Sequence, residues 1–142
     1  MKKICEYIIL FLVYGIIYEF IEVVYKGGFQ YLNLSMFLTG GACGCIIGAL
    51  NECVFTREMS IVKQVLIGGS IVTVFEFFVG CYVNLYLHMN VWDYTGIPGN
   101  ILGQICLPFF FAWCGLSFIC IFLDDCLRSL LFKKDKPKYH IF

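Results

Sequence analysis

The sequence predicts an all-α membrane protein with four transmembrane helices and both termini in the cytoplasm. Three observations lead to this prediction: the composition, four long apolar segments and the distribution of Lys and Arg. Of 142 residues, 61% are hydrophobic and only 14% are charged, with a mean hydropathy of +0.85, whereas roughly a quarter of the residues in a soluble domain are charged. A membrane-spanning helix needs roughly 20 mostly apolar residues, so we expect residues 1–142 to form one transmembrane domain of about four spans.

The four apolar segments set the expected helices. They run from about Glu6 to Tyr25, Met36 to Phe55, Val62 to Tyr86 and Ile101 to Leu123. Two lysines precede the first segment, as in a signal peptide, but that segment is longer than the apolar core of a signal peptide, contains acids and lacks a small-residue cleavage site. We therefore expect the first segment to be retained as a helix.

Lys and Arg are distributed unevenly between the two sides of these spans. Only Lys26 falls on one side, and the other side holds Lys2, Lys3, Arg57, Lys63, Arg128, Lys133, Lys134, Lys136 and Lys138. Positively charged residues accumulate in cytoplasmic loops, so both termini and a short basic C-terminal tail are predicted to be cytoplasmic. The loop that contains "WDYTGIPGN" is predicted to face outward.

Glycines recur at four-residue spacing in the second segment, at Gly40, Gly44 and Gly48. Such small-residue ridges let a neighbouring helix approach closely, which predicts helix packing here. Similar glycine spacing near the fourth segment, and the related "YEF" and "FEF" of the first and third, suggest two related helical hairpins. Asn51 and Glu52 follow the ridge, where they could contact a partner.

Three acids lie within the apolar segments, at Glu19, Glu22 and Glu76. An acid near the centre of a bilayer costs on the order of 2.5–3.5 kcal/mol, and we expect no Lys or Arg within the spans to neutralise it. Either a cation or proton binds among these acids, or the acids are neutral and hydrogen-bond between helices. The sequence leaves both interpretations open.

Polar residues gather just before the fourth segment. Trp92 and Tyr94 are typical of a membrane interface, and Asn100 and Gln104 are expected one turn apart on one helix face. Asp93 is expected to accept hydrogen bonds from backbone amides at the start of that helix. These groups could form a substrate or ion site above the three acids, or a purely structural cap.

Sequence motifs for enzymes and metal sites are absent. There is no G-x-x-x-x-G-K-[ST] phosphate loop, H-E-x-x-H or G-x-S-x-G, and His88 and His140 stand apart. The nine cysteines mostly fall inside apolar runs without a C-x-x-C pair, which favours a packing role. We expect no enzyme activity, catalytic residue, metal or cofactor.

Three stretches, "YGIIYE", "TVFEFFVG" and "VWDYTGIPGNILGQICLPFFFAW", resemble the bacterial family labelled putative ABC-transporter type IV, or CmpB-like permease. An Arg often follows the Gly in that family where this chain has Gln104, so pairing of such an Arg with the membrane acids is not expected here. The resemblance implies a permease-like or ion-coupled transport component in the cell membrane.

Such a component would contact the lipid bilayer and act as a homo-oligomer or with a partner membrane or ATPase subunit. No nucleic acid is expected to bind. The alternative is a non-transporting accessory or assembly protein in which the acids and glycines serve helix packing alone.

Overall fold

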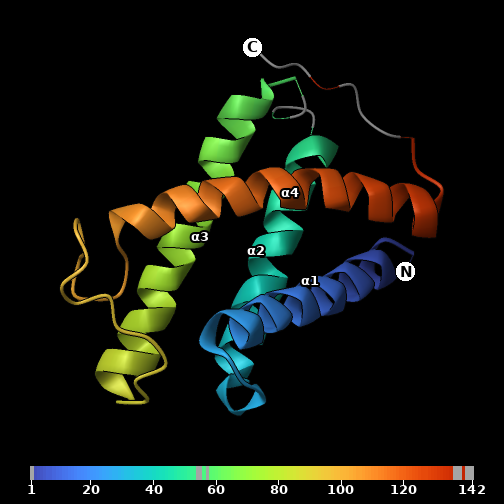
Figure 1. Ribbon diagram of the computed structural model, residues 1–142. Helices are drawn as coiled ribbons and strands as arrows, with labels where there is room; N and C mark the ends of the chain where they lie inside the picture. The colour runs from blue at the N-terminus through green and yellow to red at the C-terminus, as the bar shows by residue number, and fades with distance from the viewer. Residues whose placement is uncertain (1, 54–55, 57, 136–138, 140–142) are drawn as a thin grey trace. The chain divides into compact units, whose positions relative to one another are not determined.

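The computed structural model describes residues 2–53, 56, 58–135 and 139 (Figure 1). Over these residues it contains no strand and four helices long and apolar enough to cross a membrane. They are α1 (Lys2–Lys26), α2 (Leu34–Glu52), α3 (Ile61–Gly80) and α4 (Leu107–Phe132). The prediction of an all-α, multi-pass membrane protein is confirmed, and the cytoplasmic location of the termini stays a prediction.

Two shorter helical turns complete the fold. A 3-10 turn, η1 (Phe29–Tyr31), lies between α1 and α2, and a π-helical segment, η2 (Cys81–Tyr86), continues α3. Gly27 ends α1, since its φ of 79° belongs to the left-handed region that glycine adopts without strain. The amides of Gly27 and Gly28 both donate to the carbonyl of Val23.

The described residues form two compact units. One combines the described residues up to Glu58 with residues 120–135, and the other combines residues 59–119 with Tyr139. Helix α4 therefore contributes its first half to the second unit and its second half, from Cys120, to the first.

In the first unit, α1 and α2 pack against each other (Figure 1), and glycines of the predicted ridge lie in their contact. Gly40 lies against the side chain of Tyr18, and Gly44 lies against that of Tyr14. At Gly44 an added Cβ would be only 2.6 Å from the Cβ of Tyr14. The absence of a side chain at these positions is therefore what lets the two helices come so close.

In the second unit, a loop of residues 87–106 connects η2 to α4. The backbone amide of Tyr94 donates to the carbonyl of Gly103, at 2.8 Å, and Ile101 donates to Ile105, at 3.0 Å. These bonds fold residues 101–105 back on the loop itself. Leu102 also has a positive φ of 51°, which a right-handed helix excludes.

The predicted bounds of the fourth helix were therefore wrong at both ends. It begins at Leu107 rather than Ile101, because the preceding residues bond within the loop, and it extends to Phe132 rather than Leu123. The C-terminal extension places Arg128 inside the helix. Together with Lys26 at the end of α1 and Lys63 in the first turn of α3, it contradicts the expectation that the spans contain no basic residue.

Candidate functional site

Glu76 lies at the centre of a polar cluster in the second unit, and only 3% of its surface is exposed. The hydroxyl of Tyr94 donates to Oε1 at 2.8 Å, and the indole nitrogen of Trp113 donates to Oε2 at 2.7 Å. The ring of Tyr94 also stacks on Phe109, with centroids 4.5 Å apart. Side chains of α3, the loop and α4 thus meet at one carboxylate.

A second set of hydrogen bonds holds the loop against the π-helical end of α3. Asn84 donates from Nδ2 to Oε1 of Gln104 at 2.8 Å, and its own Oδ1 accepts from the amide of Val91 at 2.7 Å. The indole nitrogen of Trp92 donates to the carbonyl of Gln104 at 3.0 Å. Gly80 makes room for this arrangement, since a Cβ there would lie 2.6 Å from the side-chain oxygen of Gln104.

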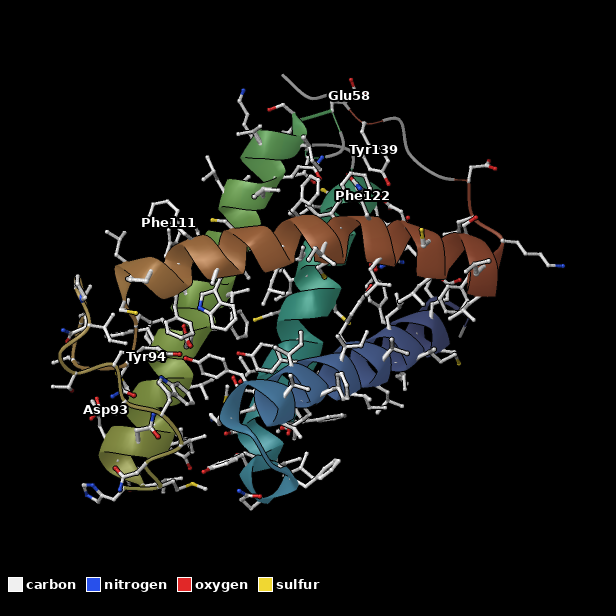
Figure 2. The ribbon with its side chains drawn as sticks, viewed as in Figure 1. Glu58, Asp93, Tyr94, Phe111, Phe122 and Tyr139 are labelled. Carbon is white, nitrogen blue, oxygen red and sulfur yellow. The ribbon has the colours of Figure 1, made fainter. Side chains whose placement is uncertain are left out.

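Two details predicted for this loop were wrong. Asn100 and Gln104 do not share a helix face, because both precede α4: Asn100 is exposed and accepts from the amide of Gly103, whereas Gln104 is buried. Asp93 accepts from the amide of Thr95 at 2.8 Å rather than from the start of a helix. Figure 2 shows Asp93 and Tyr94 on the loop.

The carboxylate of Asp93 is held in its charged form by this turn. Hydrogen bonds from the hydroxyl and the amide of Thr95 lower the pKa of Asp93 below its usual value. Because the side chain is outside the helices and open to water, Asp93 shapes the loop instead of reaching Glu76.

The other two predicted acids lie in the first unit. Glu19 is buried, and both its carboxylate oxygens lie 3.3 Å from the amide nitrogen of Asn33, at the start of α2. Glu22 forms an ion pair with Lys26, one turn later on α1, at 2.7 Å. A shared pocket for Glu19 and Glu76 stays a prediction.

Sequence reasoning missed a second buried charge cluster, which lies in the first unit around Asp124. This residue is fully buried, and its Oδ1 accepts from the hydroxyl of Tyr14 at 2.5 Å. Its Oδ2 accepts from Nε of Arg128 at 2.6 Å. The four-residue spacing of Asp124 and Arg128, which places them on one helix face, was a signal in the sequence.

Further polar pairs extend this cluster to the end of α2. Asn51 donates to Oδ2 of Asp125 at 2.8 Å, so Asn51 contacts its own chain. Lys134 lies 3.1 Å from a carboxylate oxygen of Glu52 and 3.0 Å from one of Glu6. Partial burial alone would lower the pKa of Lys134, but the hydrogen bonds to these two acids outweigh it and raise the pKa.

The structure offers little for metal or thiol chemistry in the residues it describes. No three side chains of His, Cys, Asp or Glu in that part of the chain are arranged to hold a metal ion. The nine cysteines all lie in the described part of the chain, and none of them forms a disulfide. What the two clusters can do chemically is accept hydrogen bonds, bind a proton and pair charges.

Comparison with protein-family models gives a match over most of the chain. The family model described as "Putative ABC-transporter type IV" matches residues 7–141. Neither the curated proteins nor the solved structures gave a significant match.

Proposed function

Because this chain belongs to the family described as putative ABC-transporter type IV, we propose that it is a permease-like or ion-coupled component of a membrane transport system. Its four apolar helices fit a transport-related role in the bilayer. The finer parts of the proposal concern Glu76, the partners and the location of the protein in the cell membrane.

The observation that carries the proposal is the position of Glu76. The carboxylate is buried in an apolar helix, and its two oxygens accept from donors on different segments, Tyr94 of the loop and Trp113 of α4. Ionisable groups inside membrane helices are costly and commonly mark ion or proton pathways. A proton or cation arriving at Glu76 would change both hydrogen bonds and so alter how the loop is held.

Energy coupling would come from elsewhere. The sequence contains no phosphate-binding loop of the G-x-x-x-x-G-K-[ST] type, so we propose that a separate ATPase subunit, or an ion gradient, drives transport. Four helices enclose little volume, and a path for solute would form between protomers or with a partner membrane subunit.

A specific observation also favours the alternative, an accessory protein without transport activity. Two neutral donors satisfy the two oxygens of Glu76, which is what a purely structural link between helix and loop requires. The two functions differ in whether the charge of Glu76 is needed.

The substitution Glu76→Gln tests the negative charge of Glu76 separately from its two hydrogen bonds. The amide oxygen of Gln can accept from Trp113, and its amide nitrogen can donate to the hydroxyl oxygen of Tyr94. The variant therefore keeps the link and loses the charge. Purified protein would be reconstituted into vesicles, and proton and sodium fluxes and binding would be measured alongside thermal unfolding.

Transport predicts that Glu76→Gln abolishes proton or sodium binding or flux while the unfolding temperature stays close to that of the parent. Asp135→Asn, which removes an exposed carboxylate outside the helices, is the matched control and should leave both measurements unchanged. Identical binding and flux for Glu76→Gln and the parent would reject the role of Glu76 in transport and support the accessory function.

A further inference from the structure

An open groove of about 470 Å³ runs along α1 in the first unit. Ile4, Ile8 and Leu12 line it from α1 at four-residue spacing, and Cys45 lines it from α2. The three α1 side chains are exposed. This spacing places them in one stripe on the helix, which suits an extended hydrocarbon chain.

One end of the groove is cationic. Lys3, an exposed residue in the first turn of α1, lines the groove together with Tyr7. The guanidinium of Arg128 also contacts the ring of Tyr7, with Cζ 5.2 Å from the ring centroid. Tyr7 thus belongs both to the lining of the groove and to the surroundings of the Arg128 guanidinium.

Two of the three guanidinium nitrogens of Arg128 have no hydrogen-bond acceptor among the described residues. Nε donates to Asp124, whereas Nη1 and Nη2 are buried and have no hydrogen-bond acceptor among the described residues. A buried polar group without a partner destabilises the fold, and a charged one does so more strongly. Phosphate is a good acceptor for this end of the side chain, since it accepts from both terminal nitrogens at once.

We propose that this groove binds an anionic phospholipid. The acyl chain lies along Ile4, Ile8 and Leu12, and the phosphate lies beside Tyr7, where it accepts from Lys3 and Arg128. Basic sites between transmembrane helices bind lipid headgroups in this way. A soluble anion would gain nothing from the apolar lining, and a second protein copy in the groove would have to bury the charge of Lys3.

The experiment uses the full chain purified in a neutral detergent. Lipids with identical oleoyl chains, phosphatidylglycerol and phosphatidylcholine, are added, and binding is measured by native mass spectrometry and by the shift in thermal unfolding. Phosphatidylglycerol should bind preferentially. Lys3→Gln should reduce this preference about fivefold, since one cation contributes about 1 kcal/mol to attraction of anionic lipid.

Two further variants complete the test. Arg128→Lys keeps the positive charge but loses the two-pronged donor, and should also reduce the preference. Lys63→Gln removes an equally exposed lysine from α3, which does not line the groove, and should leave the preference as in the parent.

Three results would overturn the proposal. They are equal binding of the two lipids, a preference that survives Lys3→Gln, and stabilisation by inorganic phosphate as large as that by phosphatidylglycerol. Because Lys3 is exposed, its substitution tests the site even if Arg128→Lys fails to fold.

Discussion

Replacing Gly44 by Ala tests the close packing of α1 against α2. An added Cβ at this position would lie 2.6 Å from the Cβ of Tyr14, closer than two such atoms can approach. The ring of Tyr14 cannot simply turn away, because its hydroxyl is bonded to the buried carboxylate of Asp124 at 2.5 Å. Gly44→Ala must therefore separate the helices or break that hydrogen bond.

The expected loss follows from two opposing effects. Ala is favoured over Gly in a helix by about 1 kcal/mol, whereas overpacking costs about 1–3 kcal/mol. At Gly115, in the middle of α4, an added Cβ would have nothing within 4 Å, so Gly115→Ala keeps the gain without the clash. The free energies of unfolding of the two variants should differ by about 1–3 kcal/mol.

Unfolding in mixed micelles, followed by helical content as the fraction of denaturing detergent rises, measures this difference. Gly44→Ala should unfold at a lower fraction than Gly115→Ala. Equal unfolding midpoints for the two variants would show that Gly44 has room for a side chain, and the close approach of α1 and α2 would be refuted.

Four further predictions concern the topology and the two polar clusters. Reporters fused after the last residue and within the loop before α4 should report the cytoplasm and the outside respectively, and the opposite result would contradict the charge asymmetry. Tyr94→Phe should keep the ring stacking but destabilise the fold by about 1–3 kcal/mol, measured by detergent unfolding, because Glu76 loses a donor; an unchanged midpoint would argue against this bond. Arg128→Gln should cost about 3–5 kcal/mol in the same assay, since it leaves a buried carboxylate unpaired; a loss below about 1 kcal/mol would contradict the pairing. The pKa of Asp93 is lowered in the folded protein, so its charged carboxylate stabilises the loop above its ordinary pKa of about 3.9, and this stabilisation is lost as the pH falls through the lower folded value. Amide exchange in the loop should therefore become faster at acid pH in the parent but not in Asp93→Asn.

The sequence by itself determined the helical class and the membrane location. Four apolar runs of sufficient length can satisfy their backbone hydrogen bonds in a bilayer only as helices or a closed barrel, and runs of this length favour helices. Glycines at four-residue spacing likewise indicated close packing before any contact was known. These features depend on residues near one another in the chain, which is why they can be read directly.

The polar loop was only partly predictable. Its residue types indicated a polar structure before the fourth helix, but the hydrogen bond from the amide of Tyr94 to Gly103 and the positive φ of Leu102 depend on how the loop closes on itself. No helical or strand periodicity signals such closure, so the start of α4 was placed six residues too early.

Only the tertiary structure decided the partners of the buried charges. Arg128 looked like one more cationic residue of a basic tail, yet it is buried because α4 extends past it and brings Asp124 one turn away. Tyr14, 110 residues distant from Asp124 in the chain, supplies the other hydrogen bond. Burial and hydrogen bonding are properties of what surrounds a side chain, and the packing of distant helices determines those surroundings.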